Sequence, residues 1–178
     1  MRTLHTFNTM SIPQLARARI ISWAIPRSNS HLHLFYRSKS TMSAPRPSAS
    51  LLLLSPTNQV LLLHRVNTST SFPSAHVFPG GNLDAFHDGE IGSGAEQHVD
   101  GPAYRMAAVR ECFEETGILL ARPSSDGGGG DGGGLLEVED GERDRARRRV
   151  HSREVKFGDW LETVGGVPDT GSCLSLPG

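Results

Sequence analysis

The segment from Pro102 to Gly117 constrains the fold most, because its pattern predicts one helix with an apolar face and an acidic face. Proline suits the first helical position, where no backbone N–H is needed, and glycine suits the left-handed residue that ends a helix. We therefore predict a helix from about Pro102 to Thr116. Its core-facing residues, at spacing i, i+3 and i+7, are Met106, Val109 and Phe113.

The other face of this helix predicts a divalent-metal site. On a helix, Arg110, Glu111, Glu114 and Glu115 lie three or four residues apart and share one side. Like charges at that spacing cost about 0.2–0.5 kcal/mol per pair, and a bound cation would reverse the sign. Carboxylates suit Mg²⁺ or Mn²⁺, which complete their shells with water and substrate phosphates. The alternative is a solvated acidic face with no ligand.

These residues carry a family resemblance. Arg110–Ile118 matches the second half of the Nudix box, R-E-U-x-E-E-x-G-U with U apolar, and Phe78–Asp84 resembles its P-G-G-x-x-E/D entry. The resemblance implies an α/β (α+β) fold, an α/β/α sandwich with a mixed sheet, and metal-dependent hydrolysis of a diphosphate. It also implies roles: Glu114 and Glu115 as metal ligands, Glu111 as ligand or base, Arg110 in support, and the carbonyl of Gly81 as a further ligand.

One departure from the family pattern is an insertion, Ala85–Gly101, which splits the box. The first glutamate of the box is displaced, and the nearest acids are Asp84, Asp88 and Glu90. Split boxes of this form resemble the Nudix branch that hydrolyses coenzyme A and acyl-coenzyme A in organelles. The resemblance therefore favours coenzyme A or its acyl esters as the substrate.

Short strands are predicted before the box. Ser50–Ser55 and Gln59–His64 are apolar runs joined by Pro56-Thr57-Asn58, which predicts a hairpin. His76–Phe78 is predicted as a third strand that leads into Gly80-Gly81, where missing side chains permit close approach of the backbone to a metal or phosphate.

Histidine and cysteine do not predict a zinc site. His64, His76 and His87 have no partner at zinc-ligand spacing, so we interpret them as structural or solvent-facing. Cys112 is predicted to lie in the core and Cys173 to be a lone thiol, because two cysteines in a chain of this kind imply no disulfide.

Residues 1–47 are basic and are predicted to lie outside the folded domain as a disordered segment. No Asp or Glu precedes Asp84, whereas eight of the 18 Lys and Arg residues do. Arginine with Ser and Thr but no acids is typical of a mitochondrial presequence. The alternative is a start at Met42, which would favour a peroxisomal or cytoplasmic location. We expect no membrane span, since the run Ile20–Ile25 is too short, and no nucleic-acid partner, since no basic cluster contains aromatics.

The later part of the chain carries weaker patterns. Residues 48–122 are predicted to form the N-terminal part of the domain, 123–150 a glycine-rich and charged linker, and 151–178 a remnant of the domain with an irregular tail. Within these ranges, Glu137–Lys156 is predicted as a solvated helix with ion pairs, with a phosphate-binding patch as the less favoured alternative. Phe157–Val164 is predicted as a short amphipathic helix. Because little apolar sequence follows Asp169, we expect a domain that is incomplete at its C-terminus.

The sequence thus predicts a metal-dependent pyrophosphohydrolase whose substrate is a small molecule with a nucleoside-diphosphate linkage. A catalytically inactive binding or regulatory fragment derived from the same family is the alternative. Coenzyme A, nucleotide sugars, dinucleotides and oxidised nucleotides share the diphosphate, so the box alone does not select among them. Nothing in the sequence indicates an oligomeric state.

Overall fold

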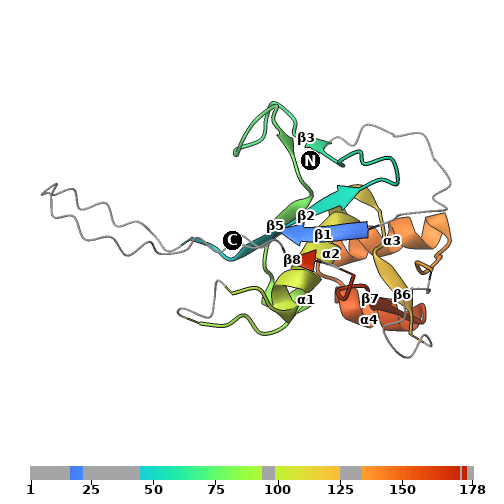
Figure 1. Cartoon of the computed structure of the whole chain (residues 1–178). Coiled ribbons are helices and arrows are strands. Elements are labelled where there is room, and N and C mark those ends of the chain that lie inside the picture. Colours follow the sequence, from blue (N-terminus) through green and yellow to red (C-terminus); the bar gives the residue numbers. More distant parts are fainter. Residues whose placement is uncertain (1–16, 22–44, 94–98, 125–133, 173, 176–178) are drawn as a thin grey trace, which may run out of the picture.

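The structure is a computed structural model of the 178-residue chain, and it describes residues 17–21, 45–93, 99–124, 134–172 and 174–175. A four-stranded sheet with the order β5-β2-β1-β8 forms one side of the domain. The central strand β2 (Ser48–Leu54) is antiparallel to both β1 (Arg17–Ile21) and β5 (Gly80–Asn82), while β1 is parallel to β8 (Leu174–Ser175). Figure 1 shows β1 and β2 side by side. The predicted mixed sheet is confirmed.

Strand β1 corrects the prediction that residues 1–47 are disordered throughout. It pairs along its whole length with β2, from Arg17 opposite Leu54 to Ile21 opposite Ser50. The run Arg-Ala-Arg-Ile-Ile contains consecutive β-branched residues, which favour a pleated strand. The sheet therefore begins well before the segment that the sequence assigned to the domain. The rest of the proposed presequence lies outside the described residues.

Strand β2 shows why four consecutive leucines form a strand and not a buried helix. Its burial alternates with period two, so that Ala49, Leu51 and Leu53 are buried while their neighbours are half-buried or exposed. The turn after it closes with a hydrogen bond from the Ser55 N–H to the Gln59 carbonyl at 2.8 Å.

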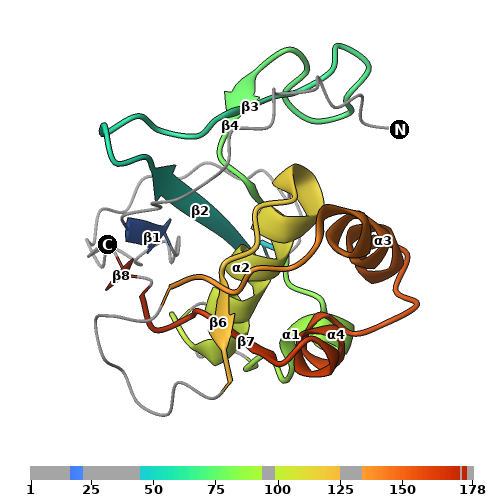
Figure 2. The same ribbon diagram turned by 90° about the vertical axis from the view of Figure 1, so that its right-hand side faces the viewer.

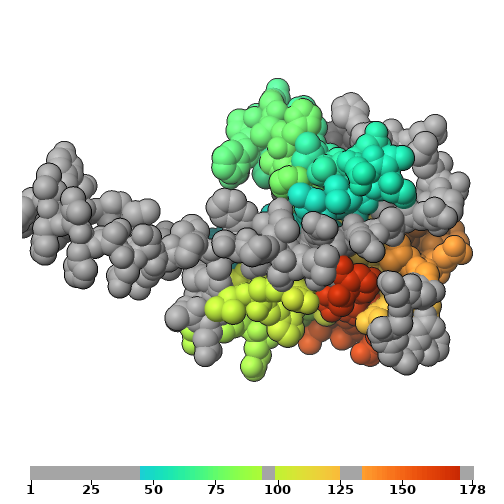
Figure 3. Space-filling model, in the orientation of Figure 1, coloured from blue at the N-terminus to red at the C-terminus, as the bar shows by residue number. Residues whose placement is uncertain are grey.

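The predicted hairpin partner of β2 is confirmed only in part. A single bridge joins Leu54 to Val60, and the regular strand β3 (Leu63–His64) pairs instead with β4 (His76–Val77). The third strand is thus present but shorter than predicted. Figure 3 shows the green surface of the β3–β4 region at the top of the molecule.

The central helix α2 (Pro102–Thr116) has the predicted bounds, and Gly117 follows it in the left-handed conformation with φ of 77°. The Gly117 N–H donates to the Phe113 carbonyl at 2.8 Å, which satisfies one of the free carbonyls at the helix end. Figure 2 shows α2 between the strands β1 and β2 on one side and the helices α3 and α4 on the other. No helix among the described residues is both long and apolar enough to cross a bilayer.

The remaining elements pack around α2. They are α1 (Ala85–Asp88), α3 (Asp140–His151), α4 (Phe157–Thr163) and the antiparallel pair of β6 (Ala121–Pro123) with β7 (Gly166–Pro168). The predicted short helix at Phe157 and the ion-paired helix after Glu137 are confirmed, the latter by pairs such as Arg145–Glu142 at 2.8 Å.

The predicted linker, 123–150, is wrong in its second half, because α3 buries Ala146 and Val150 against the domain. Most of the glycine run, at 125–133, lies outside the described residues.

An aromatic cluster joins α2 to α4. The Phe113 ring stacks on Trp160 with 5.0 Å between centroids and lies 5.6 Å from Phe157, and all three residues are at most 2% exposed. Burying one such side chain contributes about 1.5–3 kcal/mol, and each aromatic pair adds about 0.5–1.5 kcal/mol. Cys112 is fully buried beside this cluster, as predicted, and burial raises the pKa of its thiol to about 11. The cluster fixes α4 and the chain before it relative to the acidic face of α2.

His87 makes a second link to α4. It is buried, and its Nδ1 accepts a hydrogen bond from the Phe157 N–H at 3.2 Å. Nδ1 can accept only while the ring is neutral. Burial, followed by the positive charge of Arg110, lowers the pKa of His87 below its ordinary value of 6.5. His87 is therefore structural, as the sequence predicted.

We expect the free energy of unfolding to fall as the pH is lowered below about 6.5. The folded protein holds His87 neutral, so its contribution is complete above the pKa of the unfolded chain and is lost as the pH falls through the lower pKa of the folded state. Urea denaturation between pH 8 and pH 5 should show a steeper loss for the wild type than for His87→Asn, whose amide oxygen accepts the same bond without titrating. Equal pH dependence of the two proteins would contradict this assignment.

Candidate active site

Arg110 organises the acidic face of α2. Its side chain is only 4% exposed, and the five N–H groups of its guanidinium all donate within the protein. The acceptors are two Asp88 oxygens at 2.9 Å, Glu111 Oε1 at 2.9 Å, Glu114 Oε1 at 2.8 Å and the Asn82 carbonyl at 3.2 Å. Burial alone would lower the pKa of Arg110, but its bonds and charge interactions with Asp88 raise it above the ordinary value. The arginine is thus permanently charged and has no N–H left for a substrate.

Asp88 is the acid that pairs with Arg110 in this chain, in which the insertion displaces the first glutamate of the box. The Asp84 carboxylate caps α1 by accepting the Phe86 N–H at 2.9 Å, and the single helical turn that follows places Asp88 against Arg110. The Asp88 side chain is fully buried and pairs with the guanidinium through both oxygens. Of the three acids that the sequence offered, Asp88 therefore balances Arg110, Asp84 faces Arg153, and Glu90 is exposed.

The Gly80-Gly81 backbone lies directly against two of the predicted acids. The Gly80 N–H donates to Glu115 Oε2 at 3.0 Å, and a Cβ built on Gly81 would lie 2.5 Å from the Glu111 carboxylate. A side chain at Gly80 would also collide with the Ala49 carbonyl, and Gly80 has φ of 156°. Both positions thus require glycine, because the strand end and the carboxylates occupy the space of a side chain.

Glu114 points to a different set of partners. Besides Arg110, its carboxylate contacts His151 Nδ1 at 2.8 Å, and only 9% of its side chain is exposed. Within the described residues, no group of three His, Cys, Asp or Glu side chains is arranged to hold a metal ion. The structure therefore brings Glu111 and Glu115 to the glycine loop and turns Glu114 toward α3. The ligand set of three glutamates stays a prediction.

Glu111 is the acid best placed for chemistry. Burial is the largest influence on its pKa and raises it; Arg110 opposes this shift, Glu114 adds to it, and the net direction is upward. A carboxylate with a raised pKa is a stronger base and is better able to accept a proton from water.

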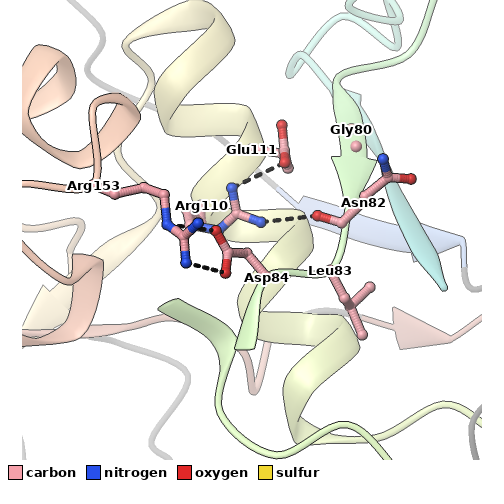
Figure 4. A pocket seen from close by; sticks show the side chains of 8 residues that line it. Gly80, Asn82, Leu83, Asp84, Arg110, Glu111 and Arg153 are labelled. Atoms are coloured by element: carbon pink, nitrogen blue, oxygen red, sulfur yellow. Dashed lines mark hydrogen bonds and ion pairs between the residues drawn. The ribbon is translucent and has the colours of Figure 1, made fainter. Parts of the chain in front are cut away.

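The wall of a pocket of about 410 Å³ combines acids, cations and exposed backbone. Figure 4 shows Arg110 reaching Glu111 and Asn82 while Arg153 pairs with Asp84 beside them. The lining residues are Gly80, Gly81, Asn82, Leu83, Asp84, Arg110, Glu111 and Arg153. Such a polar hollow suits a charged ligand better than an apolar one.

Most of the residues that line this pocket lie in a part of the chain that matches a known family. The family model of the NUDIX domain matches residues 44–127, which include the glycine loop, α1 and the whole of α2. Residues 44–127 form a Nudix domain. The resemblance carried by Arg110–Ile118 is thereby confirmed.

Two relatives match part of this chain. A Caenorhabditis elegans protein named as a nudix hydrolase 7 is 40% identical over 81 residues, which are 45% of this chain and 24% of that protein. A Gallus gallus acyl-coenzyme A diphosphatase is 31% identical over 149 residues, 62% of this chain and 39% of that protein. The matched stretches cover less than half the length of either relative. No solved structure matches the chain.

The donor atoms of this Nudix site fit a hard divalent cation. Glu111 lines the pocket with its carboxylate against Gly81, and Glu115 contacts the adjacent Gly80. Mg²⁺ takes only one or two protein carboxylates and completes its shell with water and substrate phosphates. Glu115 and the Gly81 carbonyl are the groups that would hold such an ion, and Glu111 would either join them or serve as the base.

Sequence reasoning missed three residues of the site. Asp88 was one of three alternatives, and its position one helical turn after the capping Asp84 was the signal that could have selected it. His151 and Arg153 lie in the charged run that was interpreted as solvated, and nothing in their spacing distinguished them from the neighbouring arginines.

Proposed function

We propose that this Nudix domain is a Mg²⁺- or Mn²⁺-dependent pyrophosphohydrolase that cleaves the diphosphate of coenzyme A or its acyl esters. The observation that carries the proposal is the placement of Glu111, whose side chain is 16% exposed, in a polar pocket against the Gly80-Gly81 backbone. That arrangement combines a proton acceptor with oxygen atoms that suit a hard cation. Nudix membership supports the reaction class.

In the proposed reaction, water attacks one phosphorus atom and Glu111 accepts the proton that the water loses. The bond from that phosphorus to the bridging oxygen breaks, so that each half of the substrate leaves with a terminal phosphate. A bound divalent cation would neutralise negative charge that develops on the phosphate oxygens. Arg110 acts as a positioning residue, because its bonds to Glu111 and Glu114 fix both carboxylates but leave no donor for the substrate.

The choice of substrate rests on the branch of the family. The split box resembles that of coenzyme A-hydrolysing enzymes, and the Gallus gallus relative is named an acyl-coenzyme A diphosphatase. The diphosphate is shared with nucleotide sugars and dinucleotides, so these compounds are the comparison substrates. We expect coenzyme A or an acyl ester to have the highest kcat/KM among them.

Removing the metal should abolish hydrolysis without unfolding the domain. Mg²⁺ or Mn²⁺ should support release of two phosphorylated products from coenzyme A, and excess EDTA should stop it. Circular dichroism should stay unchanged, because the described core consists of apolar and aromatic side chains. Adding back the cation should restore the rate. Turnover that persists in EDTA, or a folded protein that cleaves none of the comparison substrates with metal, would refute the proposal.

A second candidate function is ligand binding without chemistry. The observation in its favour is that Glu114 is occupied by Arg110 and His151 instead of facing the pocket. A binding domain would gain thermal stability from coenzyme A and Mg²⁺ but release no products. The same samples therefore separate the two functions.

A further inference from the structure

Arg153 is the second cation of the pocket and the one with capacity for a ligand. Arg110 uses all five N–H groups within the protein, whereas the Arg153 side chain is 60% exposed. Its contacts with Asp84 are long: Nη2 lies 3.3 Å from Oδ1, and Nε lies 3.3 Å from Oδ2. An exposed ion pair of this kind contributes little to stability, so a better anion can displace Asp84.

The backbone at Arg153 is in a conformation that favours glycine. Helix α3 ends in a Schellman motif, in which the Arg153 N–H donates to the Val150 carbonyl and the Glu154 N–H to the Arg149 carbonyl, both at 2.9 Å. Arg153 occupies the left-handed position of that motif with φ of 60°. Glycine would adopt it freely, whereas a non-glycine residue pays a conformational cost there. The fold alone therefore gives no reason for an arginine at this position.

A second cation contacts the same aromatic ring as Arg153. The Arg153 guanidinium carbon is 5.2 Å from the centroid of the Phe86 ring, and Lys156 Nζ is 5.8 Å from the same centroid. Within the part of the chain that the structure describes, no carboxylate forms an ion pair with Lys156. Arg153 and Lys156 are thus two exposed cations on one aromatic ring. Arg153 lines the pocket, and the other arginine of the pocket, Arg110, has no N–H left for a ligand.

We propose that Arg153 binds the diphosphate of the substrate, exchanging Asp84 for phosphate oxygens, and that Lys156, on the same Phe86 ring, adds positive charge. A guanidinium matches two phosphate oxygens at once, and the Phe86 ring holds the cation in place. This assignment rests on the proposed function, because it makes Arg153 the residue that fixes the diphosphate beside Glu111. The arginine at this left-handed position thus serves the ligand, although it lowers the stability of the fold.

The test is Arg153→Gly, for which ligand binding and stability should change in opposite directions. We expect KM for coenzyme A to rise about 10- to 100-fold, as for the loss of charge-assisted hydrogen bonds, with kcat changed less than about threefold. The urea midpoint should stay equal or rise, because glycine relieves the backbone. Arg153→Lys should recover part of the affinity. The matched control is Asn58→Gly, another left-handed position with φ of 60° in a distant turn, which should leave KM unchanged.

Binding of ADP, measured by calorimetry with Mg²⁺, separates this inference from the proposed function. ADP carries a diphosphate and no further phosphate, so weaker ADP binding by Arg153→Gly supports the inference even if no variant turns over coenzyme A. Unchanged ADP affinity and unchanged KM overturn it, whatever the activity. If Arg153→Gly does not fold, Arg153→Gln decides, because it keeps a side chain at the left-handed position and removes only the charge.

Discussion

Replacing Arg110 by methionine is expected to lower the free energy of unfolding by about 3–5 kcal/mol, because it leaves the Asp88 carboxylate buried without its cation. The Asp88 side chain is fully buried, and both of its oxygens accept from the guanidinium. Glu111 and Glu114 would lose the same partner. Urea denaturation at neutral pH measures the loss. Against a typical domain stability of about 5–15 kcal/mol, it would leave a marginal protein.

A double-mutant cycle identifies the ion pair as the cause. Arg110→Met with Asp88→Leu removes both charges, so the double variant should be less destabilised than the sum of the two single variants. Arg145→Met is the control, since this arginine on α3 has a side chain that is 61% exposed and pairs with Glu142 at the surface. It should change the midpoint little. Additive losses in the cycle would show that Asp88 and Arg110 do not depend on each other.

Replacing Glu111 by glutamine is expected to lower kcat for coenzyme A hydrolysis by about 10²–10⁴-fold, the range for loss of a general base. The fold should survive, because an amide fills the same volume and can still accept from Arg110. Initial rates at saturating Mg²⁺ and substrate measure the effect, and urea denaturation checks the fold. Glu162→Gln removes an exposed carboxylate on α4 and should keep the wild-type rate.

Gly81→Ala provides a sharper comparison, because it alters the position of Glu111 but not its charge. The new Cβ would come within 2.5 Å of the Glu111 carboxylate, which would have to move. We expect a rate between those of the wild type and Glu111→Gln. A wild-type rate in both variants would remove Glu111 from the reaction and leave the pocket without a base.

Helix α2 could be predicted to the residue because its signals are local. Proline marks its first residue, Gly117 marks the left-handed end, and the spacing of Val109 and Phe113 marks the buried face. Strand β1 could not be predicted, since a five-residue strand is determined by its partner, and β2 lies about thirty residues further along the chain. Pairing over such a distance leaves little pattern in the sequence itself.

The site, too, could be predicted only where the signals are local. The box predicted that Arg110 supports the glutamates, and the structure confirms its contacts with Glu111 and Glu114. Which acid would balance Arg110 depended on how α1 folds back, and the sequence offered three. Arg153 was hidden among nearby arginines, because its distinguishing features are a left-handed backbone and a place in a pocket. Both features exist only after α3 has ended and packed.

The buried pair of Asp88 with Arg110 also bears on how much the chain between the two halves of the box could vary in length. The two halves of the box are held together by that pair and by the Gly80–Glu115 and Arg110–Asn82 hydrogen bonds, and not by closeness along the chain, since α1 ends at Asp88 and α2 begins at Pro102. Doubling a loop costs only about 0.6 kcal/mol of closure entropy, whereas breaking a buried pair costs about 3–5 kcal/mol. The chain between α1 and α2 is therefore a suitable place to insert foreign sequence, because the two halves of the box would keep their positions relative to each other.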